Sequence, residues 1–399
     1  MNIKHSTNHN SPRLHYLDAV RAFALLLGIV FHASLSFMPI FIGWAVMDIS
    51  TSDFVTYFIH LSHSFRMPLF FMLAGFFSHM AINKTTLQHF VHSRLIRLVM
   101  PFVIGWFLLR PLLVAGWVLG ADSMKGDVDY LNALNQAFNT FYELPSNLLI
   151  GTHLWFLYYL ILLSACLTIG IVLFNKMPIV AKSLTQRCNR LLSTVEHNPW
   201  ILSLLLFPTA TVLWLMNAWG LDTPDKSLMP NWPVFGLYAL FFGFGIMLHN
   251  KPILLEKIVN VGKAKLCFML VTPLLSLWLA SFEANPIFGN YSLTKLVFSF
   301  GYALMMWSLI ILSLNLGKAI FTKPNKVVRY FADASFWLYF IHLPIVIFLQ
   351  VAFAELEIYW LLKLLFISLL TVAISLVLYE LIIKTTWVKR IFIPIKKNI

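Results

Sequence analysis

The chain alternates between long apolar runs and short polar segments. Each run is long enough to cross a lipid bilayer as a helix of about 20 residues, although the sixth run is short. Strands of a β-barrel would instead show about ten residues of alternating polarity, and that pattern is absent. The pattern predicts an all-α protein with about ten transmembrane spans, at Leu17–Met38, Phe54–Ile82, Leu95–Leu119, Ile150–Phe174, Trp200–Trp219, Pro233–Leu248, Leu266–Phe282, Leu293–Leu316, Phe331–Ala354 and Tyr359–Ile383.

The composition agrees with a membrane protein and excludes several other classes. Of 399 residues, 59% are hydrophobic and only 11% are charged, and the mean hydropathy is +0.79. Soluble domains have about 25% charged residues, so a soluble globular protein is excluded, and so are a disordered chain and a coiled coil. The three cysteines, Cys166, Cys188 and Cys267, are widely spaced and odd in number. They predict neither a disulfide nor a metal site.

The basic residues are concentrated in alternate loops. The formal net charge is +13, and the loops that intervene between the basic segments hold only Lys125 and Lys226. This distribution follows the positive-inside rule and predicts that both termini are cytoplasmic. No basic stripe with interleaved aromatic residues is present, so we expect no nucleic-acid partner. The basic segments, which hold 22 of the 29 Lys and Arg residues, are 1–16, 83–97, 175–199, 250–265, 317–330 and 384–399.

The sequence predicts one membrane domain without an attached soluble domain. This domain covers residues 17–383, between a cytoplasmic tail at 1–16 and a basic cytoplasmic tail at 384–399. No internal repeat, phosphate-binding loop or dinucleotide fingerprint is present. The first apolar run carries Arg21 and His32 and lacks a small-residue cleavage site, so we do not expect a cleaved signal peptide.

The first span places ionisable residues on one face. Arg21 and His32 are eleven residues apart, which on an α-helix is about 20° around the axis and about 16 Å along it. Gly28 lies on the same face between them. An ionisable residue inside a span costs about 2.5–3.5 kcal/mol on insertion scales, so it usually faces a cavity or a partner. Two simpler interpretations stay open: Arg21 pairs with Asp18 near the inner interface, and His32 only packs.

Other spans carry ionisable residues at a similar predicted height. Arg66 and His63 lie in the second span and Arg110 in the third, in the same outer half of the bilayer as His32. Polar groups at one level predict a cavity open to the outside. The alternative is that each is solvated separately near the outer interface. Weaker candidates are His153 at the start of span four, His342 in span nine, and Arg94 and Arg97 before span three.

Several motifs, taken together, resemble the integral-membrane acyltransferase 3 family. They are the spacing of Arg21 and His32 and the segments Phe-Arg-Met-Pro-Leu-Phe-Phe-Met-Leu-Ala-Gly-Phe (65–76), Arg-Leu-Ile-Arg-Leu-Val-Met-Pro (94–101) and Ala-Ser-Phe-Trp-Leu-Tyr-Phe-Ile-His-Leu-Pro (334–344). Each motif alone is weak, but their order and spacing are specific and cover nearly the whole chain. Within the family, the glucan biosynthesis protein C branch is most similar at 16–22, 63–67, 153–157 and 378–380.

The resemblance implies a membrane O-acyltransferase in the bacterial inner membrane. That branch adds succinyl groups to periplasmic glucans. The resemblance therefore implies transfer of an acyl group from cytoplasmic acyl-CoA to hydroxyls of a periplasmic glucan, with succinyl favoured and acetyl left open. Acyl-CoA would be a donor substrate, and we expect no permanently bound cofactor.

The polar residues suit this chemistry. Arg21, with Arg94 and Arg97, would hold the CoA phosphates through charge-assisted hydrogen bonds, and the pantetheine arm would run past Gly28. His32 would act as general base, and a covalent acyl-histidine is an open alternative. Arg66 would stabilise the oxyanion, and His63 is the next candidate for the base. Contacts with the substrate would come from Arg110, His153 and His342.

Two other functions stay open from the sequence. A proton-coupled transporter of a small anionic or sugar substrate would use the same intramembrane His and Arg residues. Its candidate buried acids, Asp18, Asp333 and Glu380, all lie near cytoplasmic ends, which makes a poor proton relay, and the inverted repeats common in transporters are absent. A non-catalytic membrane scaffold would leave the cost of burying Arg66 and His32 unexplained.

Overall fold

The structure is a computed structural model of the chain, and it describes residues 14–126, 128–142, 153–385 and 389–392. Most of the two predicted tails, 1–16 and 384–399, lies outside these residues. None of the described residues is in a strand. The helices, with short 3-10 or π segments marked η, are α1 (His15–Ser34), η1 (Leu35–Phe37), α2 (Asp53–Lys84), α3 (Leu87–Arg94), η2 (Leu95–Val99), α4 (Met100–Ser123), α5 (Tyr130–Asn139), α6 (Trp155–Lys176), α7 (Pro178–His197), η3 (Pro199–Leu205), α8 (Leu206–Trp214), α9 (Trp232–Asn250), α10 (Pro252–Val259), α11 (Lys263–Ala280), η4 (Ile287–Gly289), α12 (Tyr291–Ile320), α13 (Lys326–Phe353), α14 (Trp360–Leu378), η5 (Tyr379–Ile383) and α15 (Lys389–Phe392).

Local sequence explains where many of these helices begin. A polar side chain just before the first turn accepts a hydrogen bond from an otherwise unpaired backbone N–H and so stabilises the helix start. Proline at the first helical position, as in α7 and α10, has no N–H to leave unpaired. The side chains that cap in this way are Ser52, Thr86, Asp129, Asn231, Asn290 and Asn325.

The described residues contain nine helical segments that are long and apolar enough to cross a membrane, which confirms an all-α, multi-pass protein. The predicted fifth span is shorter than expected, because η3 and α8 end at Trp214 rather than at Trp219. With a rise of about 2 Å per residue in a 3-10 helix and about 1.5 Å in an α-helix, the two together still reach about 27 Å. That is close to the thickness of the hydrocarbon core, about 30 Å.

The segment of η3 and α8 runs the length of the bundle, because Lys265 near the start of α11 lies 4.3 Å from the Trp200 ring and Trp214 Nε1 donates to the carbonyl oxygen of Ser292 near the start of α12 at 3.2 Å. At one end, Lys251 beside α10 donates to the Glu196 carboxylate of α7 at 2.9 Å, and this hydrogen bond lowers the pKa of Glu196. At the other end, the backbone N–H of Asn231, which precedes α9, donates to Tyr159 Oη of α6 at 3.0 Å. Because α6 leads to α7, the segment after α7 returns to the end where α9 begins.

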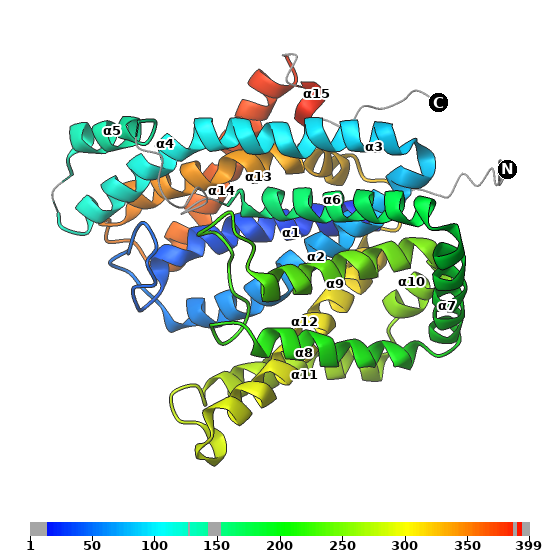
Figure 1. Cartoon of the computed structure of the whole chain (residues 1–399). Helices are drawn as coiled ribbons and strands as arrows, with labels where there is room; N and C mark the ends of the chain where they lie inside the picture. Colours follow the sequence, from blue (N-terminus) through cyan, green and yellow to red (C-terminus); the bar gives the residue numbers. More distant parts are fainter. Residues whose placement is uncertain (1–13, 127, 143–152, 386–388, 393–399) are drawn as a thin grey trace.

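The two ends of the bundle differ in character. Figure 1 shows α3, α7 and α10 at one end, and α5 and the connection between α11 and α12 at the other. The first three helices belong to the Lys- and Arg-rich segments of the chain, as the positive-inside pattern requires. The cytoplasmic placement of the termini stays a prediction.

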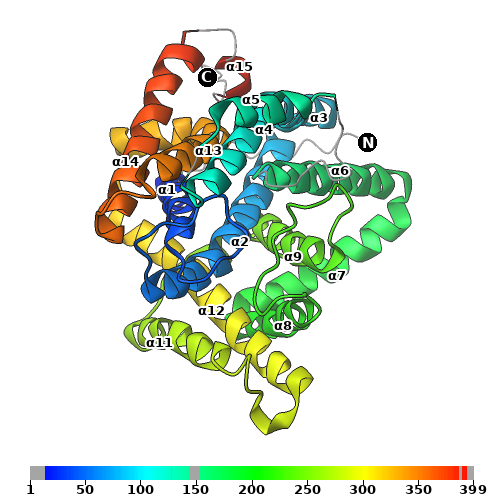
Figure 2. The same cartoon turned by 90° about the vertical axis from the view of Figure 1, so that its left-hand side faces the viewer.

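Close packing in the interior joins particular helices. Figure 2 shows α1 between α2, α13 and α14, and its other neighbour is α12. Between α2 and α9 the two backbones touch. A Cβ atom added to Gly75 would lie 1.9 Å from the carbonyl oxygen of Phe242, and one added to Gly245 would lie 1.9 Å from that of Met72. Only glycine permits this approach, so α2 and α9 form one tightly packed unit.

A buried ion pair holds the loop between α1 and α2 against α14. Lys363 Nζ lies 2.7 Å from Asp48 Oδ1, and the two side chains are 0% and 1% exposed. Ser50 Oγ accepts from the backbone N–H of Trp360 at 3.0 Å. The loop of residues 38–52 is thereby fixed, and it carries Trp44 to the end of α1.

Candidate active site

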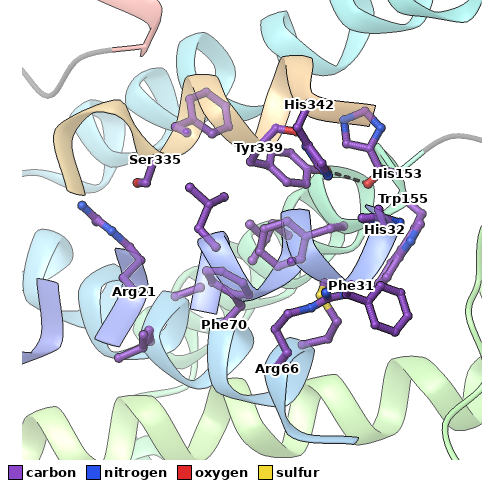
Figure 3. A pocket seen from close by; sticks show the side chains of 18 of the residues that line it. Arg21, Phe31, His32, Arg66, Phe70, His153, Trp155, Ser335, Tyr339 and His342 are labelled. Atoms are coloured by element: carbon purple, nitrogen blue, oxygen red, sulfur yellow. Dashed lines mark hydrogen bonds between the residues drawn. The ribbon is translucent and has the colours of Figure 1, made fainter. Parts of the chain in front are cut away.

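A pocket inside the bundle brings together most of the residues predicted from the sequence. It lies between α1, α2, the start of α6, and α13, and its volume is about 270 Å³. Seven of the ten predicted site residues line it, namely Arg21, Gly28, His32, His63, Arg66, His153 and His342. In Figure 3, Arg21 lies at one end of the pocket and His32, His153 and His342 lie at the other, which confirms that Arg21 and His32 share one face of their helix.

At the Arg21 end of the pocket, Arg21 and Arg94 contact neighbouring residues of α2. Arg21 Nη2 donates to the carbonyl oxygen of Ala332 at 2.8 Å, and it lies 3.8 Å from Asp18 Oδ1. The predicted pairing with Asp18 is therefore present as a long ion pair. The Arg21 guanidinium also lies 5.9 Å from the centre of the Phe77 ring. The next residue of α2, Ser78, accepts a 3.0 Å hydrogen bond from Arg94 Nη2.

His32 is held from two sides by groups from distant parts of the chain. The indole of Trp44 stacks on its ring, with centroids 5.8 Å apart and planes at 21°. Trp44 Nε1 donates to Gln350 Oε1 at 2.9 Å, and Gln350 Nε2 donates to the carbonyl oxygens of His32 and Ala33 at 3.0 Å each. Gln350 thus ties α13 to the last turn of α1. The Nδ1 atom of His32 is buried and has no hydrogen-bond partner.

Arg66 is a buried cation at the same end of the pocket. Its side chain is only 5% exposed, and its guanidinium lies 4.3 Å from the centre of the Phe31 ring, a cation–π contact. A Cβ atom on Gly28 would lie 3.4 Å from Arg66 Nη1, so the absence of a side chain at Gly28 makes room for this guanidinium. Arg66 Nη1 has no hydrogen-bond partner, and none of the described residues that line the pocket is an Asp or Glu.

Three further histidine rings surround His32 and Arg66. His63 stacks on Phe31 at 5.6 Å, and its Nε2 lies 3.3 Å from Thr223 Oγ1 in the loop before α9. His153 and His342 are 5% and 3% exposed and contact the pocket from the turn before α6 and from α13. This end therefore combines imidazoles, which bind and release protons, with a cation that lacks an acidic partner among the lining residues.

Three predicted site residues lie away from the pocket. The Arg110 guanidinium lies 4.9 Å from the centre of the Trp106 ring, and Arg110 does not line the cavity. The prediction that Arg110 forms part of the cavity wall is therefore wrong. Arg94 does not line the pocket either, but it is hydrogen-bonded to Ser78, the neighbour of the lining residue Phe77. Arg97 lies three residues after Arg94, in η2. Their roles in binding remain predictions.

Sequence reasoning missed Gln350, Trp44 and the pair of Asp48 and Lys363. Gln350 carried a usable signal, because it is an amide inside a predicted span and a polar side chain there needs a partner. Lys363 carried the same signal in span ten. Trp44 carried none, because a loop tryptophan close to the membrane interface is common in any membrane protein.

Fold and pocket together define a multi-pass helical membrane protein with a polar site buried inside the bundle. Among known families, one described as "Acyltransferase domain" matches residues 14–380, nearly the whole chain. The chain therefore belongs to this family, the acyltransferase 3 family that its motifs resemble.

Curated relatives point to a narrower group. Proteins named Glucans biosynthesis protein C from Salmonella typhi and Salmonella typhimurium are each 32% identical over 161 residues, covering 40% of this chain and 39% of the relative. The protein of that name from Salmonella gallinarum is 31% identical over 168 residues, covering 42% of this chain and 41% of the relative. The chain thus spans about two fifths of the length of these relatives. No solved structure matches the chain.

Proposed function

We propose that the protein is an O-acyltransferase that moves an acyl group from cytoplasmic acyl-CoA to a hydroxyl group of a periplasmic glucan in the bacterial inner membrane. The observation that carries the proposal is the pocket, which has a cation at one end and imidazoles with a buried guanidinium at the other. Membership of an acyltransferase family supports the reaction class, and the name of the relatives supports a glucan acceptor.

The Arg21 end is the proposed donor end. CoA carries several phosphates, and guanidinium groups bind phosphate through paired, charge-assisted hydrogen bonds. Arg21 and Arg94 lie on either side of the turn of α2 that contains Phe77 and Ser78, so one nucleotide can contact both. Arg97 would complete the cluster from the same segment as Arg94. Only the narrow pantetheine arm then has to enter the pocket, passing Gly28 on its way to His32.

His32 is the proposed general base. It removes the proton from a sugar hydroxyl, whose oxygen then attacks the thioester carbonyl and forms a new C–O bond. The negative charge that develops on the carbonyl oxygen is stabilised by the Arg66 guanidinium. When the tetrahedral intermediate collapses, the C–S bond breaks, and the departing CoA thiolate takes the proton from protonated His32. An acyl-enzyme that accumulates without acceptor would instead show that His32 acts as a nucleophile.

We favour succinyl over acetyl as the transferred group. A succinyl group carries a second carboxylate, and a buried carboxylate needs a cationic partner. Arg66 offers one, because it is buried, has an unpaired Nη1, and meets no acidic side chain among the described lining residues. Arg66 therefore has two candidate anionic partners, the free carboxylate of the acyl group and the oxyanion. The activity of an Arg66 variant with two different acyl donors can show which of them Arg66 binds.

Mass spectrometry of periplasmic glucans tests the proposal directly. Glucans from cells that carry the gene should show the added mass of an acyl group, and glucans from cells without it should lack this addition. The size of the addition identifies succinyl or acetyl. The same comparison with the purified protein in nanodiscs, given succinyl-CoA and glucan, assigns the reaction to this chain. Unchanged glucan masses in both experiments would reject the proposal and favour the transporter alternative.

A further inference from the structure

The hydrogen bonds of His342 determine which of its ring nitrogens carries the hydrogen. Nδ1 lies 2.7 Å from the carbonyl oxygen of Tyr339 and 3.1 Å from that of Leu338. A carbonyl oxygen only accepts hydrogen bonds, so Nδ1 must be the donor. In the neutral ring, Nε2 then carries the lone pair. Because these carbonyls belong to the same helix, α13, this arrangement is fixed by the fold itself.

His153 has the opposite arrangement. Its Nε2 lies 3.0 Å from the carbonyl oxygen of Phe340, so Nε2 donates and Nδ1 carries the lone pair. That Nδ1 atom is buried and has no hydrogen-bond partner. Tyr339 Oη donates to the carbonyl oxygen of His153 at 2.6 Å and fixes the backbone at this position. Both histidines are therefore hydrogen-bond acceptors toward their surroundings.

His32 lies next to these acceptors. The ring centroids of His32 and His342 are 5.3 Å apart, and those of His342 and His153 are 5.0 Å apart. In most catalytic triads the base donates its second N–H to a carboxylate, which holds the ring and stabilises the imidazolium. No carboxylate occurs among the described residues that line this pocket. His32 Nδ1 has no hydrogen-bond partner, and the adjacent ring is that of His342, whose Nε2 carries the lone pair.

We infer that His342 is a positioning residue for His32: once His32 has taken the proton, His342 Nε2 accepts a hydrogen bond from a ring N–H of His32 and stabilises the protonated ring. The inference rests on the proposed function. A neutral acceptor also has a physical advantage over a carboxylate here. The proposed donor and the proposed oxyanion are both negatively charged, and a carboxylate beside them would repel both.

Two amide variants separate the acceptor role of His342 from a packing role. Glutamine can place its amide oxygen near the position of Nε2, whereas asparagine places its amide near Nδ1 and does not reach Nε2. We expect His342→Gln to keep kcat within about tenfold of the unaltered protein. We expect His342→Asn to lower kcat by about a hundredfold, the lower range for loss of general-base assistance, with the KM for acyl-CoA unchanged.

The assay uses the full chain in nanodiscs, with His32→Asn measured in parallel. Equal losses in both His342 variants, or no loss in either, would overturn the inference. Activity in His32→Asn would instead remove His32 as the base, and absence of acyl transfer by the unaltered protein would reject the proposed function, so the failures are distinguishable. If His342→Asn does not fold, His342→Ala with added imidazole takes its place: rescue of turnover by imidazole supports the inference, and absence of rescue in the folded variant overturns it.

Discussion

His32 occupies a position that combines restraint with an unsatisfied nitrogen. Trp44 stacks on the ring and Gln350 holds the backbone, yet Nδ1 is buried without a partner. A nitrogen that only served packing would be expected to find a hydrogen bond, because an unpaired buried polar atom costs about 1–3 kcal/mol. The site therefore keeps one imidazole nitrogen available for a ligand or a proton.

The first prediction concerns His32 itself. His32→Asn keeps a side chain that hydrogen-bonds but removes the basic nitrogen, so we expect acyl transfer to fall by at least about a hundredfold. Binding of acyl-CoA in detergent, measured by calorimetry, should stay nearly normal. Turnover at the rate of the unaltered protein would move the base elsewhere, with His63 as the next candidate.

A second prediction separates the two anions proposed for Arg66. If the guanidinium pairs with the free carboxylate of the acyl group, Arg66→Gln should reduce transfer from succinyl-CoA at least about tenfold more than transfer from acetyl-CoA, since a charged hydrogen bond contributes about 1.5–3 kcal/mol. Initial rates with the two donors provide the measurement. An equal loss with both donors would assign Arg66 to the oxyanion alone.

The buried pair of Lys363 and Asp48 supports a prediction about stability. Lys363→Met leaves Asp48 buried without a cation, which should lower the free energy of unfolding by about 3–5 kcal/mol. The double variant with Asp48→Asn should recover most of this loss. The matched control is Lys384→Met, whose partner Glu380 is exposed and whose effect should be small. Chemical unfolding in detergent compares the variants, and equal effects of Lys363→Met and Lys384→Met would contradict the prediction.

At the scale of elements, α7 differs from every other long helix that the structure describes. None of its residues is buried, and it links the same end of two membrane-crossing segments, α6 and η3–α8. Val180, Leu184 and Leu191 form an exposed apolar stripe along it. Cys188 lies on the same stripe and is also exposed. A helix with this pattern at the end of spans is expected to lie in the membrane interface.

Cysteine labelling tests the position of α7. In nanodiscs, a water-soluble maleimide should label Cys188 about tenfold more slowly than a cysteine placed at Ser193 on the opposite face, because the apolar stripe is covered by lipid. The background for both measurements carries serine at Cys166 and Cys267, and the Ser193 variant also carries Cys188→Ser. Equal labelling rates would place α7 in water.

The short fifth span shows what a hydrophobic pattern can and cannot predict. The apolar run continues to Trp219, but the helix ends at Trp214. There, the Asp222 carboxylate accepts from the backbone N–H groups of Asn217 and Ala218, and Lys295 donates to the carbonyl oxygen of Met216. These partners satisfy the backbone without a helix. Hydropathy reports burial and cannot report such partners, because Lys295 is distant in the chain.

The candidate site likewise contains some residues that the sequence pattern predicts and others that it cannot predict. The periodicity of one helix is sufficient to place Arg21, Gly28 and His32 on one face, because 3.6 residues per turn is a local property. Trp44 stacks directly on the His32 ring, but its indole N–H is bonded to Gln350, some 300 positions away, and a local pattern in the sequence cannot report a contact over that separation. Arg110 was placed by height alone, and height does not determine which way a side chain points around its helix.

At the scale of the whole molecule, the charge pattern predicts the orientation in the membrane. Reporter fusions at Asp225, in the loop before α9, should read as periplasmic, and a fusion at Arg187, in α7, should read as cytoplasmic. A cytoplasmic reading at Asp225 would contradict the assigned orientation, and with it the proposed access of acyl-CoA to Arg21.

The backbone contacts of α2 with α9 at Gly75 and Gly245 have a mechanical consequence. Backbone contact makes α2 and α9 one stiff body, while Arg21 and Gln350, through their bonds to Ala332 and α1, join α1 to α13 as a second. The pocket lies along the seam between the two bodies. A molecule that reaches from Arg21 to Arg66 would bind both bodies at once and hold them together. An inhibitor of that length should therefore raise the melting temperature of the protein as well as stop turnover.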